Sequence, residues 1–539
     1  MTSNPAIQVP VTGEKPADVF VEDADADLKQ IAEPTLLRSK FADHSKKDIL
    51  RTFWRLSLTG AGVSLGGLYA GFCLSAAGNI IANQGFINQF GTVRSAQGVL
   101  ALDALHVSLW SGFVYVSQFC FQCISPFIAD RFGRRVSLCC LLVFMLGAII
   151  AEITATEWKG WLAGRLMSGA AQGFLGSGVM TYLSEIAITQ IRGAMLGAFA
   201  VSFALGQFFI AMGLQILFSP TTSCHMVILI SRFVIFGIFA AVIAYIPESP
   251  PWLCRMGKHD KGKRALKRLV GNVEGYDVEY EYSVIQQEME ASARLAALTG
   301  DSDWVALFRW ANFRRVIAAT LPFTFQNFVG VPLVYGQTTY FFHSDPFVGK
   351  TSQTVVQLGG LFLAFYFVER VGRRTLVLVG PLLLAVLNFL IGGMGFLPST
   401  PAVGSALITL FCVWTFIYAL SLAPIGWTAL VEVSSPRLRA KSAAVATGMQ
   451  TLSGILFSYT VPLMLSPQYA GWRAKIGLLF GGFTLLFWIP CYFMFPECKD
   501  RTYQELDELY ASGVPVRHFA KTKTNANLER DQRNLQGVA

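Results

Sequence analysis

Long apolar runs recur along almost the whole of this chain and restrict what it can fold into. Each run holds about 20 residues with few charges, the length that an α-helix needs to cross the hydrocarbon core of a bilayer. A chain inside lipid must satisfy its backbone hydrogen bonds internally, so we expect each run to form a helix. The predicted helices cover residues 57–80, 106–128, 136–154, 161–184, 193–217, 225–246, 316–342, 353–369, 375–396, 403–431, 442–465 and 473–495.

The composition favours a membrane protein over a soluble one. Charged residues make up 14% of the chain and hydrophobic residues 53%, whereas soluble globular domains carry about 25% charged residues. The net charge of +9 does not indicate a nucleic-acid partner, because the basic residues lie beside the apolar runs. We expect the lipid bilayer to be the main partner of this chain.

A short charged motif occurs twice, each time between two apolar runs. DRFGRR at 130–135 returns as VERVGRR at 368–374, and in each copy the glycine permits a tight reversal between two helices. Two further pairs repeat in the same order and at nearly the same spacing: Glu185 and Arg192 as Glu432 and Arg439, and PE at 247–248 as PE at 496–497. The repeat predicts an all-α membrane protein with twelve transmembrane helices in two pseudo-symmetric six-helix halves.

The distribution of Lys and Arg predicts the orientation of these helices. Eleven Lys and Arg lie between Arg255 and Arg315, and this excess places the long central loop and both tails in the cytosol. Within that loop, residues 261–270 and 279–298 have the charge pattern of surface helices. The predicted units are a disordered cytosolic tail (1–55), an N-terminal six-helix half (56–246), a cytosolic loop with short helices (247–314), a C-terminal six-helix half (315–496) and a cytosolic tail (497–539).

Six stretches between residues 130 and 510 carry a resemblance to a known family: DRFGRR, YLSEIAITQIRG, PESPPWL, VERVGRR, VEVSSPRLRAK and PECKDRTYQELDELY. With them, the chain resembles the sugar porter family of the major facilitator superfamily. QNFVGVPL at 326–333 and GQFF at 206–209 are most similar to fungal α-glucoside and maltose-type permeases. The resemblance covers nearly all of the chain except its tails.

The resemblance implies a secondary transporter of a sugar or sugar-like solute, of the hexose or α-glucoside class, that works by alternating access. It implies a monomeric carrier in the plasma membrane, not an enzyme, with neither a cofactor nor a metal. Two alternatives stay open: a carrier of another small polar metabolite, such as an organic acid or a secondary product, and a non-transporting sugar sensor. A sensor would be expected to carry a much longer cytosolic tail.

A pump driven by ATP is a candidate from a different class. GKT at 349–351 is a fragment of a phosphate-binding loop, but Ser344 stands where that motif has its first glycine. We place this fragment in a loop on the outer side and predict no nucleotide site.

Amide side chains within the runs are candidates for solute binding. Gln326 and Asn327 lie side by side in one run and Gln207 lies in another. An amide offers both a donor and an acceptor to sugar hydroxyls, and in lipid it must be paired or face a cavity. Sugar porters carry a Gln-Gln pair that binds substrate at the position of Gln326 and Asn327, so the resemblance implies that role here. Hydrogen bonding between helices is the alternative.

Two aromatic residues are further candidates. APIGW at 423–427 matches the family pattern Gly-Pro-x-x-Trp, which implies that Trp427 stacks near the sugar and that Pro424 acts as a hinge. Tyr340 ends its run near the outer side and is a candidate gate. A place in the aromatic belt at the membrane interface is the alternative for both Trp427 and Tyr340.

The resemblance also implies a pair of cytosolic latches that switch the two halves between states. One is formed by Asp130, Arg134, Glu185 and Arg192, and its twin by Glu369, Arg373, Glu432 and Arg439.

One departure from the family concerns proton coupling. Sugar porters that use protons carry an aspartate where this chain has Cys73, yet their partner arginine is present as Arg165. A thiol is a poor proton carrier at neutral or acid pH. An unpaired arginine at this depth is costly, and Glu152 is a candidate partner for it. Whether protons are a co-substrate stays open, and facilitated diffusion gains weight.

Overall fold

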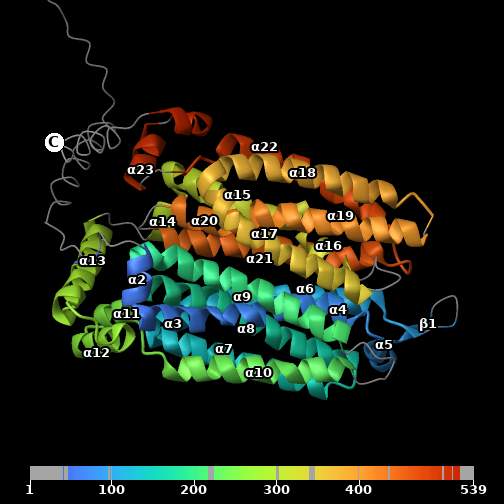
Figure 1. Cartoon of the computed structure of the whole chain (residues 1–539), viewed down its shortest axis with the longest axis horizontal. Coiled ribbons are helices and arrows are strands. Elements are labelled where there is room, and N and C mark those ends of the chain that lie inside the picture. The colour runs from blue at the N-terminus through green and yellow to red at the C-terminus, as the bar shows by residue number, and fades with distance from the viewer. Residues whose placement is uncertain are drawn as a thin grey trace, which may run out of the picture.

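The computed structural model describes residues 40–41, 46–94, 98, 100–216, 224–298, 303–338, 346–398, 400–434, 438–499, 503–512 and 514–522. Long helices run side by side in one bundle, and the two halves of the chain occupy its two sides (Figure 1). Each of the predicted runs coincides with one helix or with two consecutive ones. The fold is therefore the predicted all-α membrane bundle of two six-helix halves.

The N-terminal half contains α3 (Trp54–Ser64), α4 (Gly66–Ile80), α6 (Ala104–Phe132), α7 (Arg134–Thr154), α8 (Trp158–Ile186), α9 (Thr189–Ile216) and α10 (Cys224–Tyr245). The C-terminal half contains α15 (Trp310–Val329), α16 (Val331–Gly336), α17 (Pro346–Val371), α18 (Arg373–Met394), α19 (Pro401–Leu420), α20 (Leu422–Glu432), α21 (Arg439–Leu465) and α22 (Ile476–Met494). Each half has its own large apolar core. Across the seam, α6 packs against α21, α9 against α17 and α4 against α16.

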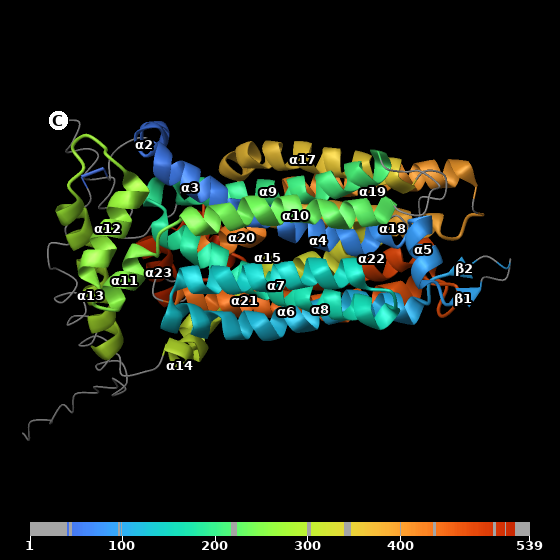
Figure 2. The ribbon, with the colours of Figure 1, turned by 90° about the horizontal axis from the view of Figure 1, so that it is seen from below.

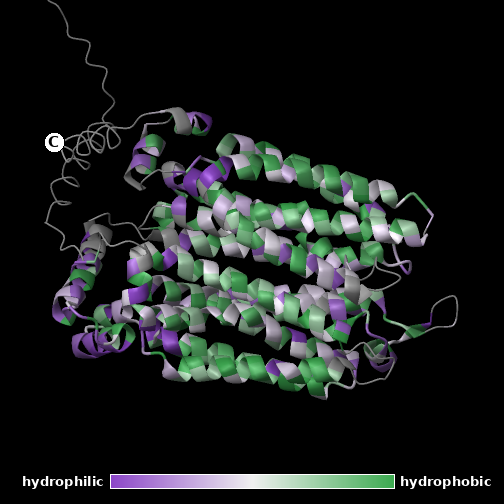
Figure 3. Cartoon of the chain, viewed as in Figure 1, coloured by the Kyte–Doolittle hydropathy of each residue, from purple (hydrophilic) through white to green (hydrophobic). Residues whose placement is uncertain are grey.

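Short elements cover the two ends of the bundle. At one end lie α2 (Lys46–Thr52), α11 (Pro250–Arg255), α12 (His259–Val270), α13 (Val278–Leu298), α14 (Asp303–Phe308), α23 (Tyr503–Ala511) and η3 (Val516–Lys521). At the other end lie α5 (Gln84–Phe90), η2 (Arg473–Lys475) and the two-stranded sheet of β1 (Val93–Arg94) and β2 (Leu100–Ala101) (Figures 1 and 2). The helices α12 and α13 lie where surface helices are predicted. The first end is rich in hydrophilic residues, whereas the bundle is mostly hydrophobic (Figure 3).

Nine helices in the described part of the chain are long and apolar enough to cross a membrane. The three remaining predicted spans correspond to α8, to α15 with α16, and to α21, which are less apolar. All three line the cavity or the contacts between the halves, where polar side chains are tolerated because they face protein or a cavity and not lipid.

Three spans that the sequence predicts as continuous are broken in the structure. The first breaks at Leu65, and the seventh at Gly330, whose φ of 116° is left-handed and therefore suits glycine. The tenth breaks at Ser421, three residues before Pro424, which agrees with the predicted interruption of the helix by this proline, while its role as a hinge stays a prediction. Pro424 lies in the first turn of α20, where a missing N–H leaves no intrahelical bond unmade.

The eighth span also differs from its prediction. It begins at Pro346 and not near residue 353, so Lys350 lies inside α17 and is buried, whereas the sequence was expected to leave it in an outer loop. Proline suits the first turn of a helix because its N–H would be unpaired there in any case.

Candidate functional site

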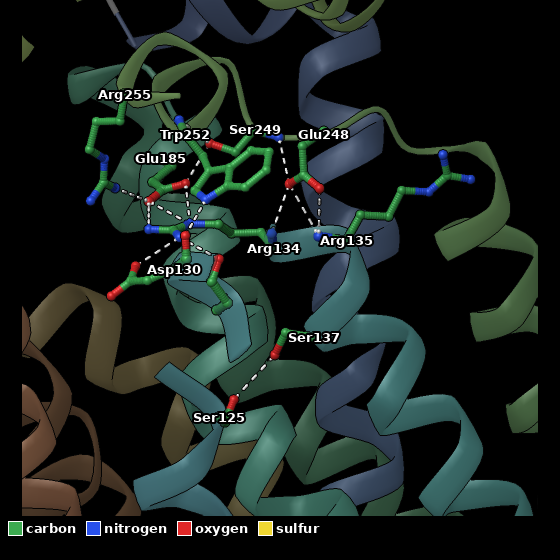
Figure 4. Close-up of polar contacts among 11 residues, drawn as sticks. Ser125, Asp130, Arg134, Arg135, Ser137, Glu185, Glu248, Ser249, Trp252 and Arg255 are labelled. Carbon is green, nitrogen blue, oxygen red and sulfur yellow. Dashed lines mark hydrogen bonds and ion pairs between the residues drawn. The ribbon is translucent and has the colours of Figure 1, made fainter. Parts of the chain in front are cut away.

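The repeated charged motif forms a dense ion-pair network at one end of the N-terminal half. Gly133 has a φ of 112° and separates α6 from α7, which places Arg134 at the first turn of α7 beside α8. Arg134 Nη2 lies 2.8 Å from Glu185 Oε1, and its Nη1 lies 2.9 Å from Asp130 Oδ1. Its Nε also donates to Glu185 at 3.0 Å (Figure 4). This forked geometry is the strongest pairing of an arginine with a carboxylate.

The segment after α10 completes this network. Glu248 Oε1 accepts from the backbone N of Arg134 at 2.8 Å, and Glu248 also accepts from the backbone N of Arg135 at 3.2 Å. A carboxylate there satisfies free N–H groups at the start of α7 and opposes the positive end of its dipole. Ser249 Oγ donates to Glu185, and Arg255 Nη2 lies 3.2 Å from Glu185 Oε1 (Figure 4). Sequence reasoning gave these three residues no role, although PESPPWL is one of the family stretches.

The C-terminal half repeats the arrangement. Arg373 Nη2 and Nε each lie 3.1 Å from an oxygen of Glu432. Glu497 accepts from the backbone N of Arg373 at 3.0 Å and of Arg374 at 3.1 Å, as Glu248 does in the first half. The repeat predicted from sequence is therefore present as matched hydrogen bonds. The side chains of Glu369 and Arg439 lie outside the described residues.

Arg192, the fourth predicted member of the first network, is half-buried at the start of α9. It interacts electrostatically with Glu288 of the loop helix α13. Burial raises the pKa of Glu288 above its ordinary value, and the charge of Arg192 partly offsets this. The loop between the two halves thus interacts with a residue of the predicted latch.

A cavity lies on the seam between the halves. Both halves line it, through α4, α6 and α8 on one side and α16 and α21 on the other. Its polar lining includes Ser111, Tyr115, Arg165, Gln172, Gln337 and Ser458. A second, smaller cavity shares Ser111 and Arg165 with it. Among the predicted residues, Arg165 lies in this wall, and sequence reasoning missed the other five.

The predicted binding amides do not line this cavity. Gln326 Oε1 accepts from the Tyr418 hydroxyl at 2.7 Å, while its Nε2 has no partner within the described residues. Asn327 Nδ2 donates to Gln450 O at 2.6 Å and to Ser453 Oγ at 2.7 Å, which is the interhelical bonding kept as the alternative. Gln207 is buried, and its Oε1 has no partner in the described part of the chain. Tyr340 and the side chain of Trp427 lie outside the described residues.

A buried charge cluster adjoins the cavity in the N-terminal half. Glu152 Oε2 accepts from Arg232 Nη1, and Glu152 Oε1 accepts from Ser168 Oγ at 2.9 Å. Arg232 Nη2 lies 3.3 Å from Cys73 Sγ. Arg165 Nη1 lies 3.8 Å from Glu152 Oε1, so the predicted pair exists as a weaker contact. Arg232 was missed, although a lone arginine inside the run 225–246 is itself a signal of a buried partner.

Comparison with known proteins places this geometry among carriers. The family model described as "Sugar (and other) transporter" matches residues 59–510. The MFS transporter fmqE of Aspergillus fumigatus is 29% identical over 85% of this chain and 86% of its own length. A general alpha-glucoside permease of Saccharomyces cerevisiae is 27% identical over 74% of this chain and 66% of its own length. A high-affinity glucose transporter of Kluyveromyces lactis is 23% identical over 84% of both chains.

The fold has close counterparts among solved structures. The inward-open conformation of the xylose transporter XylE from E. coli superposes with a TM-score of 0.68 at 20% identity, covering 84% of this chain and 99% of that one. The partially occluded inward-open conformation gives a TM-score of 0.67. These likenesses confirm the bundle of two halves predicted from the repeat.

Proposed function

Because the chain belongs to the sugar (and other) transporter family of the major facilitator superfamily, we propose that it moves a sugar or sugar-like solute across a membrane by alternating access. The single observation that carries this proposal is the cavity whose wall is shared by the two halves. Rocking of one half against the other exposes such a site first to one side of the membrane and then to the other. Hexoses and α-glucosides are the first solutes to test, because relatives are named for glucose and for alpha-glucosides.

The two arginine networks act in this proposal as latches at the cytosolic end. Tyr115 of the cavity wall and Asp130 of the first network both lie on α6, fifteen residues apart in its numbering. At 1.5 Å per residue this separates the cavity from the latch by about 22 Å along the helix. Each formed network joins helices of one half, so its proposed role is to fix the cytosolic ends of that half while the halves move, and the cavity lies toward the other end. Gln326, Gln207 and Trp427 are proposed to join the solute site when the halves move.

The proposal also covers the orientation of the chain in the membrane and the membrane in which it lies. We place both termini in the cytosol and the carrier in the plasma membrane as a monomer. The basic loop helices, α2 and α23 lie at the same end of the bundle, which supports a shared side (Figure 1). Accessibility of tags at each terminus in intact cells tests the orientation, and a tag reached from outside contradicts it.

Transport without proton coupling is proposed because Cys73 occupies the position of the family's aspartate. Its sulfur is instead engaged by Arg232. Uptake is expected to continue in the presence of a protonophore. Cys73→Asp introduces an acid beside Arg232 and is expected to make uptake sensitive to the protonophore, with Cys73→Ser as the matched control. Wild-type uptake that stops with the protonophore overturns this proposal.

The deciding experiment is uptake in a host without its own sugar transporters, against a panel of hexoses, disaccharides and polyols. Concentrative or facilitated uptake of any neutral member supports the proposed solute class. A second candidate, a carrier of another small polar metabolite, is favoured by the similarity to fmqE, whose name specifies no sugar. Absence of uptake for the whole panel in a correctly folded carrier supports this second candidate.

A further inference from the structure

We propose that the solute of the seam cavity carries a carboxylate and that Arg165 binds it. This inference rests on the proposed transport function and names its substrate class more narrowly. Arg165 is 3% exposed and lines both cavities. It makes no hydrogen bond within the described residues, and its Nε is buried without a partner. A buried guanidinium with unused donors is costly unless an acceptor reaches it.

Glu152 does not fill that role. Its two oxygens already accept from Ser168 Oγ and Arg232 Nη1, and its distance of 3.8 Å to Arg165 is too long for a hydrogen bond. Two arginines therefore share one carboxylate, and Cys73 supplies no compensating acid. The cluster keeps a net positive charge, and its more weakly paired arginine is the one at the cavity wall.

A buried lysine lies behind the opposite wall. Lys350 of α17 is 1% exposed and donates to the neutral oxygens of Tyr335 (3.2 Å), Thr338 (3.3 Å) and Gln353 (3.0 Å). Tyr335 and the residues after it line the cavity, so the ammonium lies directly behind this wall. Within the described residues, Lys350 has no carboxylate partner. Arg165 therefore supplies the positive charge at this cavity, and a charge in a low-dielectric interior attracts an anion.

The remaining polar groups of the cavity wall indicate which uncharged groups the solute carries besides its carboxylate. Hydroxyls of Ser111, Tyr115 and Ser458 and amides of Gln172 and Gln337 offer both donors and acceptors. Such groups suit a polyhydroxylated body, whereas the planar fork of Arg165 suits a carboxylate. The chemical class that satisfies both is a sugar acid, a polyol that bears one carboxylate.

The test compares two probes of the same carbon number, D-gluconate and D-glucose, on the purified full chain in proteoliposomes. We expect counterflow of labelled gluconate. We also expect unlabelled gluconate to inhibit the transport of labelled gluconate at concentrations at least tenfold lower than glucose requires. Equal competition, or preference for glucose, overturns the inference and leaves the proposed function standing. If neither probe is bound or transported, the inference falls, and the panel of neutral solutes above decides the proposed function separately.

Variants then assign the preference to one side chain. Arg165→Gln is expected to reduce the gluconate-to-glucose preference at least tenfold, and Arg165→Lys to reduce it less, because it keeps the charge but loses the fork. Lys159→Gln, which removes an exposed charge from the same helix, is the matched control and keeps the wild-type preference. Size-exclusion profiles check folding, and Arg165→Lys serves as the readout if Arg165→Gln does not fold. An unchanged preference for gluconate over glucose in a folded Arg165 variant overturns the assignment. Loss of gluconate binding in equimolar chloride also overturns it, because the site would then bind any anion.

Discussion

Glu152 of α7 and Arg232 of α10 form an ion pair in which both side chains are 1% exposed. The two residues lie in apolar runs that the sequence predicts as separate spans, and their contact ties two helices of the N-terminal half together. Arg165 of α8 approaches the same carboxylate from a third helix. One acidic side chain therefore organises three helices beside the cavity.

Loss of Glu152 and loss of Arg232 are expected to destabilise the fold by different amounts. Loss of one partner of a buried pair leaves an uncompensated charge and typically costs about 3–5 kcal/mol. Glu152→Gln leaves two arginines without a carboxylate, whereas Arg232→Gln leaves Glu152 beside Arg165. We therefore expect a larger drop in thermal midpoint in detergent for Glu152→Gln. The exposed Glu157→Gln is the control, and equal drops for both buried variants contradict this sharing of the carboxylate.

Charge reversal at Arg134 is expected to reduce the transport rate strongly while solute binding is retained. Arg134 holds Glu185 and Asp130 far from the cavity, so its loss disturbs the latch and not the site. Uptake rates and equilibrium binding of the transported solute, measured on Arg134→Glu, separate the two effects. Arg131→Glu changes an exposed arginine of the same turn and serves as control. Loss of binding together with normal cycling is the outcome that would refute the latch.

Gln326→Ala is expected to weaken solute affinity by at least about 1 kcal/mol, close to fivefold, because a buried hydrogen-bonding group is lost. Tyr418→Phe removes the hydroxyl that bonds Gln326 Oε1 and leaves the amide in place, so it is the matched variant. We expect a smaller change in affinity for it. Dissociation constants of the transported solute for both variants test this prediction. An unchanged dissociation constant for Gln326→Ala would show that Gln326 does not bind the solute.

The glycine of each charged turn is expected to resist substitution. Gly133 and Gly372 have φ values of 112° and 97°, and an added Cβ would also meet the carboxylates of Glu248 and Glu497. Both effects disfavour Gly133→Ala and Gly372→Ala, each by more than about 1 kcal/mol. Gly237 lies in α10 with no atom near an added Cβ, so Gly237→Ala should be neutral or slightly stabilising. Thermal midpoints of the three variants in detergent test this order, and tolerance at Gly133 would count against it.

Much of the fold follows from local properties of the chain. Spans are set by apolar length, and the turns at Gly133 and Gly372 are set by glycine between charged residues, so both are visible in the sequence. The breaks at Leu65 and Ser421 are only partly local, because Gly66, Gly67 and Pro424 weaken the helix nearby but packing against neighbouring helices selects the exact point. The burial of Lys350 escaped prediction for a similar reason: charge and a Gly-Lys-Thr pattern indicated a loop, but the helix extends back to Pro346.

For the site, the sequence by itself determined which residue types enter the membrane, namely the buried amides, Arg165 and Cys73 in place of an acid, and placed the repeated arginine motifs in the turns between spans. Local chemistry suffices for this, because a charge or amide within an apolar run must find a partner or a cavity wherever the helix lies. Only the tertiary structure decided which partner each one found. In the folded chain, Glu152 pairs mainly with Arg232, and Asn327 hydrogen-bonds to α21. Glu185 contacts Ser249 and Arg255 as well as Arg134. Such pairings join residues far apart in the chain, and they depend on how whole helices pack, which no single segment encodes.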